Sequence, residues 1–242
     1  PKFRDEIAAL VKEHGDVKIS AVTISQAYGG MRGVNGLVCD TSEVPPDKGL
    51  IIRGMPIGDL TEKSPEEVFW LLVTGELPTN AQVKDLSDDL KSRAKVPDYV
   101  WKVLEAMPKD SHPMAMFDTA ILVMEKESKF RLNYDLGMKK SDYWVWTLED
   151  ALDIVAKLPE IAAGVYRMRF DKGPRIPSDS SLDWSGNYVK MLGLGDPGGK
   201  FTECMKLYLV LHSDHESGNV SAHTTFCVNS ALSDLYYSLS AG

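Results

Sequence analysis

Apolar residues recur at helical spacing along most of the chain from Ser64 onward. Ser64 is a good N-cap residue, and Glu67 completes a capping box ahead of an apolar run. Gly75 predicts the end of this helix because glycine readily takes the left-handed conformation. Thr79 and Gln82 repeat the same device, so the pattern predicts two well-capped helices in succession.

The helical spacing continues in shorter segments. Further helices are predicted after Pro97, after Pro113, from Ser141 onward, over 182–192, over about 202–212 and after Asn219. Pro159 falls inside the segment that opens at Ser141, and it should break or kink that helix. Residues 172–181 form the clearest loop, and a basic cluster around it is expected to be a solvated face; its members are Arg167, Arg169, Lys172 and Arg175.

The first part of the chain has a different pattern. Residues 1–14 carry apolar positions on one side of a modest helix that Gly15 should end. Residues 17–24 alternate partly, as in a strand. Two apolar stretches, 36–44 and 48–54, then flank a Pro-Pro-Asp turn and predict a hairpin. The expected fold class is therefore mainly α, multi-helical, with a small β hairpin near the N-terminus.

The composition is that of an ordinary soluble globular protein, with 43% hydrophobic and 26% charged residues. The formal net charge of -8 argues against a nucleic-acid or membrane-surface binder. No apolar run approaches the roughly 18 residues of a membrane span, and the chain opens without a signal-type segment. Cys39, Cys204 and Cys227 are widely spaced, which indicates free thiols in a reducing compartment.

The segment LHSDHESGNVSAHT, residues 211–224, holds three of the five histidines and most of the candidate chemistry. His215 falls in a short polar turn between two predicted helices, and Asn219 can cap the second of them. The free backbone N–H groups at the start of that helix favour anions. The turn therefore predicts a binding corner for a small anionic molecule, with His215 as its main donor and Asn219 beside it.

A metal site is the alternative for the same segment. His212, Asp214, His215 and His223 have the right side-chain types for zinc. However, neither HExxH nor another zinc spacing is present, which makes this the weaker interpretation. Taken alone, His212 and His223 are expected to serve structural needs of their helices.

The Gly-rich stretch YGGMRGVNG, residues 28–36, contains Arg32, which would suit a phosphate. It matches neither a P-loop nor a dinucleotide fingerprint, so a simple turn remains the alternative. The residues alone thus lead to a helical protein with an anion-binding histidine corner.

The segment HSDHESGNVSAHT resembles citrate synthase, specifically the type of eukaryotic mitochondria. Further segments resemble that family in the family's own order, from about Ile24 onward: YGGMRGVNGLV, FWLLVTGELPT, AKLPEIAAGVYR, SLDWSGNYVKMLG and SALSD. The resemblance implies an α-helical homodimer, a transferase that joins acetyl-CoA to oxaloacetate and releases citrate and CoA at the entry of the tricarboxylic acid cycle. It implies no metal and no tightly bound cofactor.

Residue by residue, the resemblance assigns His215 and Asn219 to oxaloacetate binding and Arg32 to the phosphates of CoA. It assigns no catalytic residue within this chain, since the family's catalytic histidines and aspartate are expected beyond Gly242. Residues 1–242 are thus expected to form an incomplete large domain, without the small domain and C-terminal helices, and to be inactive alone. Two apolar faces are then expected to be exposed, Tyr208 with Leu211 and Leu235 with Leu239.

Other functions remain open. Within the family the rival is 2-methylcitrate synthase, which uses propionyl-CoA. From other classes come a metal-dependent hydrolase and a non-catalytic fragment that binds or assembles. The resemblance and the free thiols favour the mitochondrial matrix, with the peroxisome as the alternative.

Overall fold

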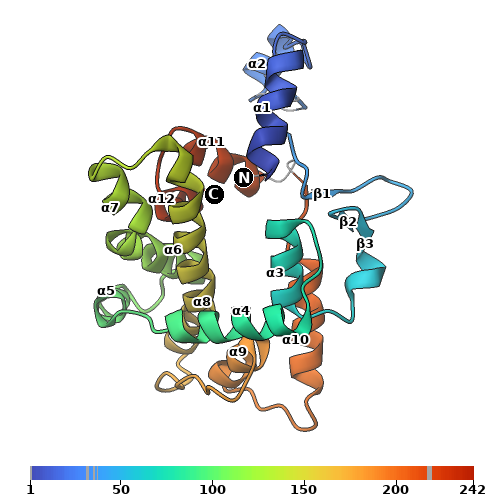
Figure 1. Ribbon diagram of the computed structural model, residues 1–242. Helices are drawn as coiled ribbons and strands as arrows, with labels where there is room; N and C mark the ends of the chain where they lie inside the picture. Colours follow the sequence, from blue (N-terminus) through green and yellow to red (C-terminus); the bar gives the residue numbers. More distant parts are fainter. Residues whose placement is uncertain (1, 31–32, 35, 37, 217–219) are drawn as a thin grey trace. The chain divides into compact units, whose positions relative to one another are not determined.

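A computed structural model describes residues 2–30, 33–34, 36, 38–216 and 220–242 of the chain. It divides into two compact units, Pro1–Val38 and Cys39–Gly242. Figure 1 shows that helices predominate and that a small three-stranded sheet is the β element. The predicted fold class, mainly α with a small hairpin, is confirmed. Among the described residues, no helix is long and apolar enough to cross a membrane.

The first unit contains two helices, α1 (Lys2–His14) and α2 (Ile24–Tyr28). The predicted first helix is confirmed, but the strand expected at 17–24 is wrong. Residues 17–23 lie outside regular structure, and Thr23 instead caps α2. Thr23 and Gln26 form a reciprocal capping box, so local side-chain hydrogen bonds outweigh the weak alternation of apolar residues.

The second unit begins with the sheet. Strand β1 (Ser42–Glu43) pairs antiparallel with β2 (Ile51–Ile52), which pairs with β3 (Met55–Pro56). The predicted hairpin is therefore confirmed. Ile52 is fully buried in a cluster with Leu60, Val68, Leu71 and Val210, so the sheet packs on the helices that carry these residues.

Helices α3 (Pro65–Thr74) and α4 (Asn80–Arg93) begin where their capping boxes predict, and α3 ends where Gly75 predicts. The side chain of Ser64 accepts from the N–H of Glu67, and the Glu67 carboxylate accepts from the N–H of Ser64 at 2.8 Å. Gly75 ends α3 in the left-handed conformation, with φ of 84°. Arg53, in the turn between β2 and β3, donates twice to the carbonyl of Leu72 and so ties the sheet to α3.

The remaining helices follow along the chain. Their bounds are α5 (Asp98–Ala106), α6 (Pro113–Val123), α7 (Lys129–Asp135), α8 (Tyr143–Arg169), α9 (Trp184–Leu192), α10 (Lys200–Leu211), α11 (Val220–Ser230) and α12 (Leu235–Ala241). The longest of them, α8, packs against α4, α6, α7, α9 and α12. Short 3₁₀ helices span Ile57–Leu60, Met124–Glu127 and Lys140–Asp142. The sequence pattern did not predict α7, whose start depends on a distant residue. The buried carboxylate of Asp150 in α8 accepts from Ser128 Oγ and from the N–H of Lys129, both at 2.7 Å.

Helix α8 continues through Pro159, so the break that the sequence offered as one outcome is wrong, while the kink offered as the other stays a prediction. A proline inside a helix leaves the carbonyl one turn earlier without its N–H partner. Here that carbonyl belongs to Val155, and the indole Nε1 of Trp184 donates to it at 3.1 Å. The lost hydrogen bond is therefore replaced by a side chain from α9, and the helix continues.

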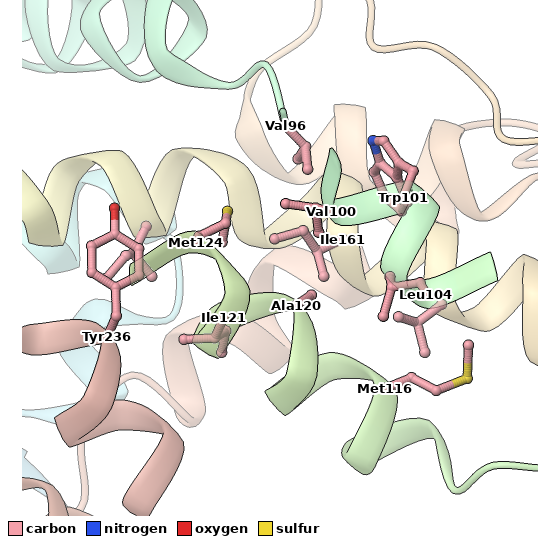
Figure 2. Packing of buried hydrophobic residues seen from close by; sticks show 12 residues of the cluster. Val96, Val100, Trp101, Leu104, Met116, Ala120, Ile121, Met124, Ile161 and Tyr236 are labelled. Carbon is pink, nitrogen blue, oxygen red and sulfur yellow. The ribbon is translucent and has the colours of Figure 1, made fainter. Parts of the chain in front are cut away.

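The main core lies between α5, α6, α8 and α12, as Figure 2 shows. Tyr236 of α12 is fully buried there, and Leu235 and Leu239 pack against the cluster. The expectation that Leu235 and Leu239 are exposed is therefore wrong, because α12 turns this face toward α6 and α8. Tyr208 and Leu211, in contrast, are 54% and 40% exposed, as expected.

Trp101 can pack in this core because a glycine, Gly164, leaves room for its ring. A Cβ on Gly164 of α8 would lie only 2.6 Å from the Trp101 ring, so the ring packs directly on the helix backbone. The guanidinium of Arg175 lies 4.0 Å from the centroid of the same ring and bonds Glu160. Glycine at 164 is therefore required by the close approach.

Charged side chains join α4, α7 and α8. Arg93 lies 2.8 Å from Glu149 and 3.0 Å from Asp153, and Lys129 lies 2.9 Å from both carboxylates. Hydrogen bonds from Arg93 and then Lys129 hold the pKa of Glu149 at about 2. The network therefore favours the ionised glutamate.

Arg167 corrects the expectation of a solvated basic face. Its guanidinium is buried and donates to the carbonyls of Pro174 at 2.7 Å and Leu192 at 2.9 Å, and also to that of Lys172. The loop predicted at 172–181 is thus fastened to the end of α9. Gly193 follows Leu192 with φ of 73°, and a Cβ there would collide with the guanidinium.

Candidate functional site

The predicted histidine corner begins at the end of α10. The carboxylate of Asp196 caps the N-terminus of this helix by accepting hydrogen bonds from the N–H groups of Phe201 at 2.8 Å and Thr202 at 3.0 Å. It ends at Leu211, where the N–H of His212 still bonds the carbonyl of Tyr208. The residues that follow, 213–216, leave the helix and form the turn that holds His215.

His215 is exposed, and its side chain makes no hydrogen bond to another group in the part of the chain that the structure describes. Its backbone N–H donates to Oδ1 of Asp214 at 2.9 Å. An imidazole can both donate and accept hydrogen bonds. His215 is therefore accessible to a small anion, as the sequence predicts.

The turn is held from outside by strand β1. Ser42 is buried, and its Oγ accepts from the N–H of Glu216 at 2.6 Å. Glu216 has φ of 47°, a left-handed conformation that a residue with a Cβ rarely adopts. The sequence contains no local signal for this contact, because the two residues are 174 positions apart.

Asp214 lies close enough to Cys39, three residues before β1, for its charge to act on that thiol. Burial opposes ionisation of the Cys39 thiol and Asp214 adds a repulsive charge, but hydrogen bonds with Thr41 and Ser42 outweigh both and lower the Cys39 pKa. Oδ2 of Asp214 is buried and has no hydrogen-bond partner among the described residues. One oxygen of this carboxylate is therefore enclosed by the protein, although the residue as a whole is half-buried.

His212 and His223 lie apart from this arrangement. His212 bonds the Tyr208 carbonyl through Nδ1 at 2.8 Å and stacks on the Tyr208 ring, with centroids 4.1 Å apart. His223 is exposed on α11. Within the described ranges, no group of three His, Cys, Asp or Glu side chains is placed to hold a metal ion. The four-residue metal site considered from the sequence is thus not assembled there.

Two predicted site residues, Arg32 and Asn219, lie outside the described residues. All three cysteines are free, as predicted.

An apolar cavity of about 320 Å³ opens beside His212 and Ser213, between α3, α8 and α9, and His215 does not line it. The corner around His215 is therefore the part of the predicted site that the structure describes.

Residues 30–242 match the family model of the citrate synthase C-terminal domain. The whole chain is 46% identical to mitochondrial citrate synthase of Saccharomyces cerevisiae and covers 52% of that protein. It is also 46% identical to the peroxisomal citrate synthase of the same yeast and to mitochondrial 2-methylcitrate synthase of Yarrowia lipolytica, covering 54% of each. The chain thus spans about half the length of these relatives.

Solved structures have the same fold. Citrate synthase from Pyrobaculum aerophilum is 25% identical with a TM-score of 0.80, over 93% of this chain and 56% of that one. The enzyme from Thermoplasma acidophilum, in a ternary complex with carboxymethyl coenzyme A and oxaloacetate, is 21% identical with a TM-score of 0.75, over 91% and 55% of the two chains. The family model, the relatives and the fold agree: this chain belongs to the citrate synthase family.

Proposed function

We propose that the protein containing this chain is a citrate synthase, which condenses acetyl-CoA with oxaloacetate and water to give citrate and CoA. The observation that carries the proposal is the 46% identity to mitochondrial citrate synthase over the entire chain. The site also supports the proposal, because the imidazole of His215 is exposed in the turn that precedes α11.

In this proposal the His215 corner binds oxaloacetate. The substrate is a small dianion, and His215 can donate a hydrogen bond to one of its oxygens. Asn219 is proposed to line the same site and Arg32 to bind the phosphates of CoA, both from the family resemblance. The Thermoplasma structure, which contains oxaloacetate and a CoA derivative, supports these ligand classes.

Condensation also requires a base that removes a proton from the thioester methyl and a donor for the enolate oxygen. Both groups must be positioned, because losing either typically lowers the rate by about 100-fold or more. We propose that parts of the protein other than residues 1–242 supply them, and that these residues are part of its large domain. The chain's coverage of only 52% of its yeast relative agrees with this division.

We further propose a homodimer located in the mitochondrial matrix, with the peroxisome as the alternative. One yeast relative is named mitochondrial and the other peroxisomal. Because the chain is 46% identical to each, the two names support the two compartments equally. A 2-methylcitrate synthase is the second candidate function, since the Yarrowia enzyme is also 46% identical. Comparing kcat/KM for acetyl-CoA and propionyl-CoA separates the two activities.

The test is release of CoA thiol by the full-length natural protein from acetyl-CoA and oxaloacetate. His215→Ala should raise KM for oxaloacetate by about 10- to 100-fold, the value of one charge-assisted hydrogen bond. The KM for acetyl-CoA should change much less. His14→Ala is the matched control, because it removes an exposed histidine of α1. Absence of thiol release from the wild-type protein with either acyl-CoA would refute the proposal.

A further inference from the structure

The hydrogen bond between Ser42 and Glu216 joins the sheet to the turn that carries His215. Its length is 2.6 Å, and Ser42 is only 7% exposed. The donor is the backbone N–H immediately after His215. Any change in this bond therefore acts on the backbone that aims the imidazole.

The Ser42 side of the bond is fixed by the sheet. Ser42 pairs with Ile52 in the β1–β2 ladder, and Ile52 is fully buried in the cluster that includes Val68 of α3 and Val210 of α10. Arg53, next to Ile52, donates to the Leu72 carbonyl at the end of α3. The hydroxyl of Ser42 is thus held on a rigid support.

The Glu216 side of the bond requires such a support. Its left-handed φ of 47° is unfavourable for a residue with a Cβ, so the turn would relax without an external partner. Apart from Ser42, the polar contact that residues 214–216 make in the described part of the turn is local, from the His215 N–H to Asp214 at 2.9 Å. Ser42 is therefore the anchor that sequence neighbours do not provide.

We propose that Ser42 is a positioning residue of the oxaloacetate site. By accepting the Glu216 N–H it holds the backbone around His215, so that the imidazole meets the substrate already oriented. Preorganisation of this kind improves affinity because the ordering cost is met before the ligand binds. The inference rests on the proposed function, in which His215 binds oxaloacetate.

A purely structural role for the same hydroxyl makes a different prediction. In that case Ser42→Ala would lower the stability of the protein but leave KM for oxaloacetate unchanged. Positioning instead changes KM for oxaloacetate and spares KM for acetyl-CoA. It also predicts recovery in Ser42→Thr, which retains a hydroxyl and suits a strand.

The experiment uses the full-length natural protein and measures KM for each substrate and kcat. Ser42→Ala should raise KM for oxaloacetate by about 3- to 10-fold, the range of one ordinary hydrogen bond. Ser42→Thr should return it to within about twofold of wild type. The matched control is Ser238→Ala, which removes the buried hydroxyl that donates to the Asp234 carbonyl at 2.7 Å. If Ser42→Ala does not fold, Ser42→Cys, with a weaker acceptor, should give an intermediate KM.

Amide hydrogen exchange provides a second measurement that does not depend on the substrate. Exchange at Glu216 should become faster in Ser42→Ala than in the Ser238→Ala control, because the N–H loses its acceptor. An unchanged KM for oxaloacetate in a folded Ser42→Ala protein overturns the proposal, as does unchanged exchange at Glu216. Failure of the wild-type protein to bind oxaloacetate overturns the proposed function instead, while the exchange at Glu216 still reports whether Ser42 holds the turn.

Discussion

The bond from Trp184 to the Val155 carbonyl explains how α8 passes Pro159, and it can be tested by substitution. Trp184→Phe removes the indole N–H but keeps an aromatic ring, so the carbonyl loses the donor that lies at 3.1 Å. An acceptor left unpaired costs about 1 to 3 kcal/mol. Val155 and Trp184 also line the cavity of about 320 Å³, so water can partly replace the indole. We therefore expect a loss of about 1 to 2 kcal/mol in the free energy of unfolding.

A double-mutant cycle isolates the role of the proline. Pro159→Ala restores a backbone N–H that can bond the Val155 carbonyl. In that background, Trp184→Phe removes only a second hydrogen bond and should cost about 0.5 kcal/mol. The expected coupling free energy between the two positions is thus about 1 kcal/mol. The assay is equilibrium urea unfolding of the four proteins, followed by far-ultraviolet circular dichroism so that loss of a tryptophan does not change the signal.

Trp144→Phe serves as the control, because Trp144 is 50% exposed. Its cost should stay within about 0.5 kcal/mol. Equal costs of Trp184→Phe in the two backgrounds would show that the indole does not compensate for Pro159. The reasoning about α8 would then be refuted.

Two further predictions concern charge and packing. The pKa of Glu149 is about 2, below its usual value near 4.5, owing to Arg93 and then Lys129. Because this pKa is lower in the folded protein than in the unfolded chain, the ionised carboxylate stabilises the folded state above about pH 4.5. This contribution is lost as the pH falls toward about 2. The free energy of unfolding in urea should fall more steeply between about pH 5 and pH 3 for the wild type than for Glu149→Gln. Gly164→Ala should lower the free energy of unfolding by about 1 to 3 kcal/mol, since its Cβ would lie 2.6 Å from the Trp101 ring.

Each of these has a matched control. Glu203→Gln removes an exposed carboxylate of α10 and should leave the acid-dependent decline as in wild type. Gly58→Ala adds a Cβ that meets nothing within 4 Å and should change stability by less than about 0.5 kcal/mol. Parallel pH profiles for wild type and Glu149→Gln would contradict the first prediction. Equal effects of the two glycine substitutions would contradict the second.

The sequence predicted those elements whose causes are local. Ser64 with Glu67 and Thr79 with Gln82 fixed the starts of α3 and α4, because a capping box needs only residues three apart. The break predicted at Pro159 was wrong because the relevant contact is not local. The group that compensates for it, Trp184, comes from another helix and has no signature near the proline.

The same distinction applies to the site. The sequence placed His215 in a turn between two helices, and the structure describes it there, exposed. It did not predict that Ser42 holds this turn, because that contact spans 174 positions. Arg167 was expected in solvent since isolated charges are rarely buried, yet three carbonyls satisfy its guanidinium.

The Arg167 contacts also limit how this region can evolve in length. The guanidinium bonds backbone carbonyls at Lys172, Pro174 and Leu192, so it recognises chain geometry rather than side-chain identity. Substitutions in the loop leave these carbonyls in place, whereas adding or removing one residue between 167 and 174 shifts them out of register. Surface loops usually absorb insertions and deletions readily. This one should vary in sequence among related proteins while keeping its number of residues.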